Sequence, residues 1–209
     1  MSDGIRPIKT DLKREIPAYR ARRGAFEMVD VPPLRYLMID GHGDPNGQTF
    51  AEAISTIFPV AYRLKFMSKK ESDRDYVVMP LEALWWSDDM AAFTSDRDKS
   101  RWDWTVLNLV PDWVSDDQFT RALAAIGDAP ALGRLRLATL TEGRCVQTLH
   151  LGPFDGEGPV LDAMHHDFIP ARGLRMTGRH HEIYLSDIRR TEPSKLRTIL
   201  RQPVEDVPM

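Results

Sequence analysis

Short stretches of apolar or alternating side chains indicate the strands of this chain. They cover 34–40, 75–86, 102–109, 144–151, 180–185 and 196–201. Each stretch is bounded by glycine, proline or charged residues, as strands usually are. Successive side chains of a strand point to opposite faces, so the segment 180–185 predicts His180, Glu182 and Tyr184 on one face. His181, Ile183 and Leu185 are then expected on the other face.

Three further stretches carry apolar residues at helical spacing. The first covers 48–65, and Pro59 is expected to kink or shorten it because proline lacks an amide hydrogen. The second begins at Ser115, which with Gln118 forms a predicted capping box, and Gly127 is expected to end it. The third begins near Pro159, a residue suited to the first position of a helix.

The order of these elements repeats along the chain. Strand, glycine-rich loop, helix, strand, strand occurs at 34–109 and again at 144–201. We therefore expect one α+β domain over residues 1–209. Its parts are an arm at 1–25, a first module at about 26–110, a connecting helix and linker at 111–143, and a second module at about 144–204. A cleft between two such halves is a common ligand site.

Composition narrows the class of protein. With 42% hydrophobic residues among 209, the chain can bury a substantial core. A net charge of -3 gives no basic field for nucleic acid. The lone Cys145 cannot form an internal disulfide, and no apolar run approaches the roughly 20 residues that cross a bilayer. The first residues also lack the features of a signal peptide. We expect a cytoplasmic protein that contacts neither membrane nor nucleic acid directly.

No metal or cofactor is expected. The pairs His165-His166 and His180-His181 join neighbours that are badly placed to chelate together, and no zinc spacing of cysteine and histidine occurs. The loop at 41–47 lacks the lysine of a P-loop and the spacing of a dinucleotide fingerprint. The acidic loop at 87–99 and the residues just after it contain Asp88, Asp89, Asp96, Asp98 and Asp103. These aspartates lack the spacing of a calcium-binding loop, so we interpret the loop as a solvated segment that would cover the mouth of a pocket.

Glu182 is the first candidate for chemistry. Burying a carboxylate is costly without a partner, and Tyr184 lies two positions away on the same predicted face. One interpretation is a structural hydrogen bond inside the sheet. The other is a pocket in which the carboxylate attracts a cation or, with a raised pKa, acts as a general acid or base.

Aromatic residues supply the candidate walls of this pocket. Trp85 and Trp86 are adjacent and point apart. Trp86 shares a face with Glu82 and is the first choice for the pocket, with Trp85 under the helices. Glu82 is expected either to supply a second carboxylate near the seam between the halves or to be an exposed strand residue. Trp104 is a further candidate, although core packing is the commoner fate of tryptophan. His150 is expected either to reach the cleft or to be a satisfied core histidine.

Several sequence blocks together resemble the GyrI-like small-molecule-binding proteins, more narrowly their stand-alone bacterial branch. The blocks are Tyr36-Leu37-Met38-Ile39-Asp40-Gly41-His42-Gly43-Asp44-Pro45, Pro80-Leu81-Glu82-Ala83-Leu84-Trp85-Trp86, Trp102-Asp103-Trp104-Thr105, Gln147-Thr148-Leu149-His150-Leu151-Gly152-Pro153-Phe154-Asp155 and His181-Glu182-Ile183-Tyr184-Leu185-Ser186-Asp187. The likeness runs from about Arg6 to Val204. It implies tandem strand-helix-strand-strand modules, a mainly antiparallel sheet with the helices on one face, and a ligand cleft on the other, concave face.

The resemblance also implies functions. The glutamate of the family falls on Glu182, its tyrosine on Tyr184, and its aromatic wall on Trp85 or Trp86 and on Trp104. The first function is binding of hydrophobic, aromatic or cationic small molecules, for drug sensing or sequestration. The alternative is a hydrolase that opens the cyclopropane of DNA-alkylating natural products, with Glu182 and Tyr184 as catalytic residues. A third role in the broader family is restraint of a topoisomerase. The expected partner is a small molecule, and both a monomer and a homodimer are compatible with the sequence.

Overall fold

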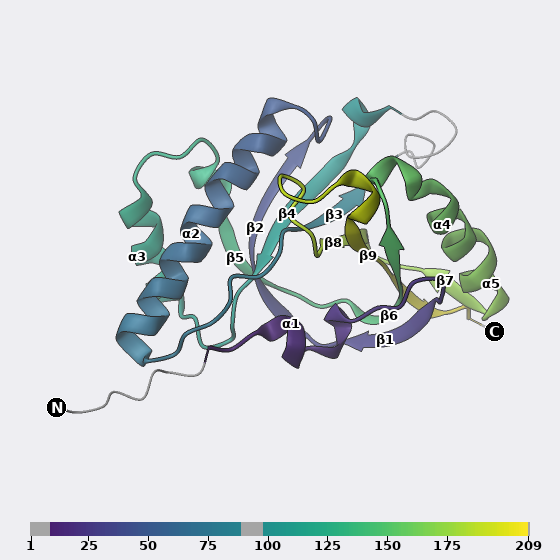
Figure 1. Ribbon diagram of the computed structural model, residues 1–209, viewed down its shortest axis with the longest axis horizontal. Helices are drawn as coiled ribbons and strands as arrows, with labels where there is room; N and C mark the ends of the chain where they lie inside the picture. The colour runs from purple at the N-terminus through teal and green to yellow at the C-terminus, as the bar shows by residue number, and fades with distance from the viewer. Residues whose placement is uncertain (1–8, 89–97, 209) are drawn as a thin grey trace.

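The computed structural model describes residues 9–88 and 98–208 and shows a curled antiparallel sheet with helices packed on one face (Figure 1). The strands of the described residues are β1 Glu27–Val31, β2 Leu34–His42, β3 Glu82–Trp86, β4 Asp103–Leu109, β5 Arg136–Leu140, β6 Gly143–Leu151, β7 Leu174–Met176, β8 His180–Tyr184 and β9 Arg197–Asp206. Their order in the sheet is β1-β6-β9-β8-β3-β4-β2-β5, and β7 pairs with β9 off this path.

The helices follow the predicted positions. They are α1 Leu12–Glu15, α2 Gln48–Ser72, α3 Asp116–Ile126, α4 Gly158–Asp162 and α5 Ile169–Ala171. A π-helical segment, Ala163–Phe168, joins α4 to α5. Short 3-10 turns lie at Pro17–Tyr19, Lys99–Arg101, Leu132–Arg134, Phe154–Gly156 and Pro193–Lys195. Ser115 and Gln118 form the predicted capping box of α3, and Gly127 follows its last residue.

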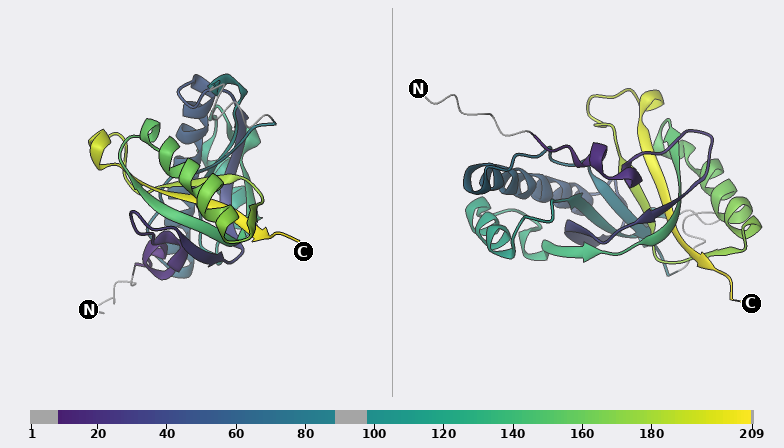
Figure 2. Two further views of the ribbon diagram at one scale, coloured as in Figure 1. Left: turned by 90° about the vertical axis from the view of Figure 1, so that its right-hand side faces the viewer. Right: turned by 90° about the horizontal axis from the view of Figure 1, so that it is seen from below.

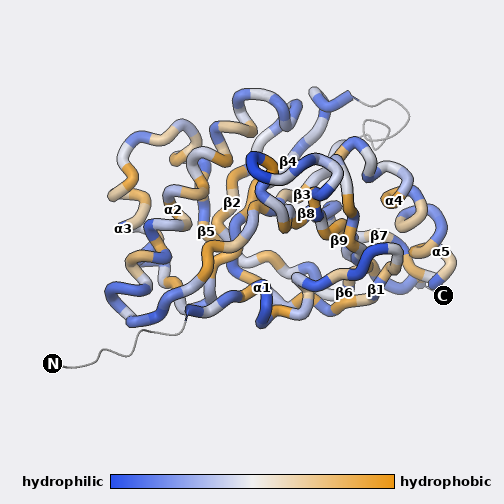
Figure 3. Tube along the Cα trace, viewed as in Figure 1, coloured by the Kyte–Doolittle hydropathy of each residue, from blue (hydrophilic) through white to orange (hydrophobic). Residues whose placement is uncertain are grey.

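The expected α+β architecture is confirmed. The strand-helix-strand-strand order appears as β2-α2-β3-β4 and again as β6-α4/α5-β8-β9, and the two series meet where β3 pairs with β8. The buried residues of α2 pack against β2, β3 and β4 in one core cluster, and Met164 of the π-helical segment and Ile169 of α5 pack against β6 and β9 in another. Figure 3 shows hydrophobic segments gathered along the sheet and hydrophilic ones at the loops and helix ends.

Pro59 does not shorten its helix, contrary to expectation. The helix α2 continues through Pro59 to Ser72. Its inner face, including Ile57, Val60 and Leu64, is fully buried against the sheet. Burial of several such side chains at about 1.5–3 kcal/mol each outweighs the roughly 3 kcal/mol that a proline costs inside a helix.

The strand predicted at 75–86 is also shorter than expected. Only Glu82–Trp86 pairs within the sheet, while Tyr76 forms an isolated parallel bridge with Thr10 of the N-terminal arm. Pro80 offers no amide hydrogen for a ladder, which separates the two parts. The sequence reading missed β1, β5 and β7, and the first two of these are the edge strands of the sheet.

The N-terminal arm covers part of the sheet face opposite the helices. Leu12, Ile16 and Tyr19 pack in one apolar cluster with side chains of β2, β3, β4, β8 and β9. Figure 2 shows this segment apart from α2 and α4. The arm contains a four-residue helix and a 3-10 turn.

Candidate functional site

Glu182 and Tyr184 stand on β8 with their side chains toward the helices. In the register of β3 and β8, Ala83 lies opposite Glu182 and Trp85 lies opposite His180. Ala83 and Trp85 belong to the core cluster beneath α2, and Tyr184 packs against the same cluster. The Glu182 side chain remains 14% exposed and the His180 side chain 12% exposed. We call Trp85, Glu182 and Tyr184, together with the aromatic rings that contact them, the Glu182 site.

A chain of hydrogen bonds links three of these residues. The indole nitrogen of Trp85 donates to the Tyr184 hydroxyl at 3.2 Å, and that hydroxyl donates to Glu182 Oε2 at 2.6 Å. Burial raises the pKa of Glu182 to about 7, although the Tyr184 and Trp85 hydrogen bonds and the charge of His181 oppose the rise. The carboxyl group is therefore able to change protonation state near neutral pH.

Aromatic rings surround the hydrogen-bonded chain. Trp85 stacks on Phe50 with ring centroids 5.6 Å apart and meets Trp102 edge-on at 5.8 Å. Phe154, which is 38% exposed, lies edge-on to Tyr184 at 5.4 Å. These contacts fix the planes of the rings beside the carboxylate, and Phe154 offers a solvent-facing apolar surface.

Trp104 is fully buried and supports this arrangement from below. Its ring packs edge-on against Phe50 at 4.9 Å, and its indole nitrogen donates to the Gly43 carbonyl at 3.2 Å. Gly41 lies directly against the ring, because a Cβ there would be 2.1 Å from Trp104 Cη2. In this structure Trp104 is thus a core residue beside the Glu182 site.

Two predicted residues face the opposite side of the sheet. Glu82 and Trp86 alternate with Ala83 and Trp85, so the register places Trp85 beside the Glu182–Tyr184 pair and turns Trp86 away. The guanidinium of Arg179 lies 3.4 Å from the Trp86 ring centroid. Glu82 is fully buried.

His150 lies two strands away from Tyr184 in the sheet. His150 of β6 lies opposite Thr198 of β9, and on the other side of β9 Thr198 lies opposite Tyr184 of β8. His150 Nε2 lies 3.1 Å from the Pro153 carbonyl oxygen. The ring lines a cavity of about 400 Å³ between β6, α4 and the arm, whose walls include Phe26, Thr148, Leu149, Pro159, Val160 and Ala163.

A buried charge network, missed by the sequence reading, occupies the sheet face opposite the helices. His181 Nδ1 lies 3.0 Å from Glu142 Oε1, and His181 Nε2 lies 3.0 Å from Glu82 Oε2. Arg201 donates to Glu142 at 2.9 Å, and Tyr19 donates to Glu82 at 2.5 Å. Alternation along β8 places His181 on the face opposite Glu182. The signal that could have revealed Arg201 is a charged residue within the apolar stretch at 196–201, because a buried charge needs a partner.

The charges of this network hold one another in the ionised state. Burial lowers the pKa of His181, but the charge of Glu142, the hydrogen bond that the ring makes to it and the nearby Glu82 carboxylate outweigh burial and raise that pKa to about 9. Burial likewise opposes ionisation of Glu142, yet His181 and Arg201 bring its pKa to about 2. Paired and hydrogen-bonded in this way, the cluster is a structural element.

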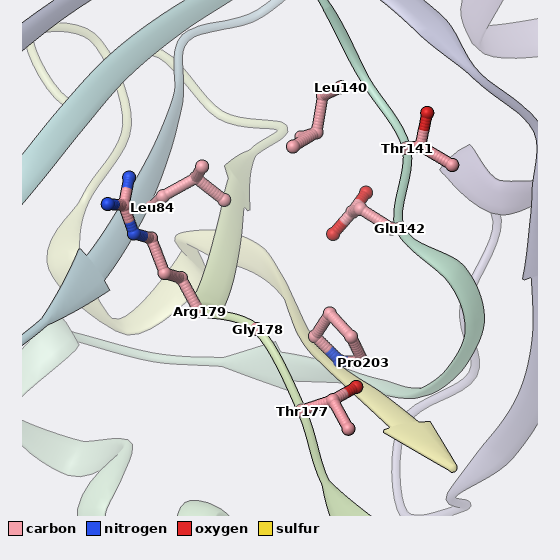
Figure 4. Close-up of a pocket in the computed structure, with 8 residues that line it drawn as sticks. All are labelled: Leu84, Leu140, Thr141, Glu142, Thr177, Gly178, Arg179 and Pro203. Carbon is pink, nitrogen blue, oxygen red and sulfur yellow. The ribbon is translucent and has the colours of Figure 1, made fainter.

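A cavity of about 350 Å³ adjoins the network on this face (Figure 4). Its lining residues are Leu84, Leu140, Thr141, Glu142, Thr177, Gly178, Arg179 and Pro203. Figure 4 shows the Glu142 carboxylate pointing toward the cavity. The face opposite the helices therefore does carry a cavity, while Glu182 stands on the helix side.

Comparison with known proteins identifies the family. The family model described as the GyrI-like small molecule binding domain matches residues 25–205. The chain belongs to this GyrI-like family. No match is found among curated proteins.

Comparison with solved structures shows which proteins this GyrI-like chain resembles. It is 38% identical to an uncharacterised conserved protein from Listeria innocua, with a TM-score of 0.85 over 94% of this chain and 100% of that one. It is 36% identical to a protein described as a hydrolase from Listeria innocua, with a TM-score of 0.81 and the same coverage. The C-terminal domain of EcmrR, 13% identical with a TM-score of 0.58 over 88% of this chain and 98% of that one, shares the fold alone.

Other expected features of this GyrI-like domain concern metals and membranes. Within residues 9–88 and 98–208, no group of three or more histidine, cysteine, aspartate or glutamate side chains is placed to hold a metal ion. No helix in the same ranges is long and apolar enough to span a membrane. Asp89 and Asp96, with most of the acidic loop, lie outside the described residues.

Proposed function

We propose that this GyrI-like domain binds hydrophobic, aromatic or cationic small molecules at the Glu182 site, for sensing or sequestration. The observation that carries the proposal is the partly exposed Glu182 carboxylate, held by Tyr184 and Trp85 among aromatic rings. A flat ligand would stack on such rings, and a cation would be attracted both to their faces and to the carboxylate.

The electrostatic contribution is large enough to select cations. Two opposite charges about 4 Å apart at an effective dielectric constant of about 20 attract by about 4 kcal/mol before desolvation is counted. Glu182 keeps Oε1 free of the Tyr184 hydrogen bond, which engages Oε2. Oε1 of Glu182 is therefore the expected contact of a bound cation.

A hydrolase function at the same residues is the alternative. It is favoured by the pKa of Glu182 near 7, which suits a general base, and by the likeness to the Listeria innocua protein described as a hydrolase. In this version Glu182 takes a proton from water, the water oxygen bonds to one carbon of a strained cyclopropane, and the electron pair of the broken ring bond moves to the other carbon and the carbonyl group conjugated with it. The proton held by Glu182 then passes to that group, so that one water is added overall. Tyr184 would hydrogen-bond the charge that develops on the leaving electron pair.

A titration with the Glu182→Gln variant tests the binding function. Ethidium, an aromatic cation, is titrated into the wild type and the variant, and binding is followed by calorimetry. The variant is expected to bind about 10- to 100-fold more weakly, because the amide is neutral. Glu15→Gln, an exposed position on α1, is the matched control and should bind as the wild type does. Equal affinity of all three proteins would contradict a role for the carboxylate.

A second experiment separates binding from catalysis. The protein is incubated with a cyclopropane-bearing alkylator, and the ring-opened product is followed by mass spectrometry. Turnover that disappears in Glu182→Gln while binding of the alkylator persists supports the hydrolase. Tight ethidium binding by a protein that turns over no alkylator supports the sensor.

A further inference from the structure

Two histidines beside Glu182 have nitrogen atoms without hydrogen-bond partners. Both ring nitrogens of His180 and the Nε2 of His165 are buried and unpaired among the described residues. His180 Nε2 lies 3.7 Å from Glu182 Oε1, which is too long for a hydrogen bond. The His165 and His180 rings meet edge-on with centroids 5.7 Å apart. The hydroxyl of Thr198, fully buried beside Tyr184, is unpaired as well.

Such a concentration of unpaired groups is unusual in a folded protein. More than about 90% of buried polar groups have a partner, and each exception costs about 1–3 kcal/mol. The neighbouring His181 differs in its charge environment, because a carboxylate oxygen lies 3.0 Å from each of its ring nitrogens, although its Nε2 makes no regular hydrogen bond either. The unpaired nitrogens of His165 and His180 have neither a hydrogen bond nor a carboxylate within hydrogen-bond distance among the described residues.

The local backbone brings the two rings together. His165 lies in the π-helical segment Ala163–Phe168, between α4 and α5. Widened turns of this kind are rare and frequently occur at functional sites. The segment carries His165 from the helix layer to the sheet, where it meets His180 at the start of β8.

We propose that His165 and His180 form a hydrogen-bonding subsite that binds a neutral polar substituent, such as a hydroxyl, of an aromatic ligand whose ring system lies at the Glu182 site. The inference rests on the proposed binding function and narrows its ligand class. A neutral imidazole presents one donor and one acceptor, so a hydroxyl group between the two rings would donate to a nitrogen of one and accept from a nitrogen of the other. Burial, with the charges of neighbouring histidines, lowers the pKa of both rings, which keeps them neutral at pH 7.

This subsite distinguishes between two kinds of ligand. A cation made of hydrocarbon rings would satisfy Glu182 but leave the imidazole nitrogens unpaired. A ring system that carries a hydroxyl group would pair them. The subsite would therefore bind a ligand that lacks the polar group more weakly than one that carries it. Rejection of such an analogue is the strongest form of selectivity that a buried hydrogen-bonding site provides.

A matched pair of probes tests the subsite. Phenanthrene and 9-phenanthrol differ by one hydroxyl group, and their binding is followed through their fluorescence. Wild type is expected to bind 9-phenanthrol about 3- to 10-fold more tightly, the value of one hydrogen bond. His180→Phe should lose this preference while still binding phenanthrene, and His180→Asn, which keeps a donor and an acceptor, should retain part of it.

The outcomes separate this inference from the proposed function. If phenanthrene binds and Trp85→Ala weakens it, but the hydroxyl adds nothing or its gain survives in His180→Phe, the subsite is refuted and the aromatic binding site stands. If neither probe binds although ethidium does, the subsite is refuted and the cation-binding function stands; if ethidium also fails to bind, both proposals fail. Thermal unfolding supplies a further readout, because His180→Phe removes unpaired polar atoms and should keep or raise the melting temperature. A clear drop would identify His180 as a structural residue and overturn the proposal.

Discussion

Replacing Glu182 by glutamine is expected to stabilise the folded protein at neutral and alkaline pH. In the wild type, burial raises the pKa of this carboxyl group from an ordinary value of 4.5 to about 7. The folded protein therefore resists the ionisation that the unfolded chain undergoes freely. Glutamine has nearly the same shape and still accepts the hydrogen bond from Tyr184, but it never ionises.

The size and sign of the effect follow from the two pKa values. Between 4.5 and about 7 the folded state binds more protons than the unfolded state, so the wild type loses stability as pH rises through this window. Each pH unit corresponds to about 1.4 kcal/mol, which gives a loss of about 3 kcal/mol, complete somewhat above pH 7. The difference between variant and wild type should thus be near zero at pH 4.5 and grow to about 3 kcal/mol by pH 8.

Urea unfolding at half-unit pH steps from 4.5 to 8.5 measures this difference. Other titrating groups contribute to each protein alike: His181, whose pKa is raised to about 9, stabilises both below pH 6.5 and loses that contribution as pH rises toward 9. Subtracting the two curves removes such shared terms. A flat difference across the range, or a variant that is less stable than wild type at pH 8, would refute the reasoning.

Two further predictions concern the scaffold. Gly41→Ala is expected to lower stability by about 1–3 kcal/mol in thermal unfolding, because its Cβ would overlap the Trp104 ring, whereas Gly133→Ala, whose Cβ would meet nothing within 4 Å, should be nearly neutral; equal losses would contradict the close approach. Arg201→Met is expected to cost about 3–5 kcal/mol in urea unfolding, because it leaves Glu142 buried with less compensation, and adding Glu142→Gln should recover part of the loss. No recovery in the double variant would show that the pair does not act as a unit.

The face on which each side chain of a strand lies was predictable from the sequence, but the register in which the strands pair was not. The sequence places His180, Glu182 and Tyr184 on one face of β8 and pairs Glu82 with Trp86 on one face of β3, and the structure agrees with both. Which face of β3 meets which face of β8 depends on the register between two strands about 100 positions apart. A shift of one residue exchanges all the partners, so periodicity within each strand cannot choose Trp85 over Trp86.

The histidine subsite and the charge network escaped the sequence reading for a related reason. His165 and His180 meet only because a π-helical segment approaches the start of β8. Arg201, Glu142 and His181 come from three segments that converge on one face. Adjacent histidines were correctly read as pointing apart, but the partners that each one finds are set by packing.

The two faces of β8 show opposite treatments of buried polar groups, and the contrast separates scaffold from site. On one face His181 is held by two carboxylates, which are themselves paired with Arg201 and Tyr19. On the other, the ring nitrogens of His180 have no hydrogen-bond partner among the described residues and Glu182 resists ionisation. A network of opposite charges paired within the chain stabilises the fold, and its members should lower stability when removed. Buried polar groups without hydrogen-bond partners lower the stability of the folded protein, and binding of a ligand that pairs with them would account for their presence. Replacing His181 and replacing Glu182 should therefore move stability in opposite directions at pH 8, although the two residues are neighbours in the chain.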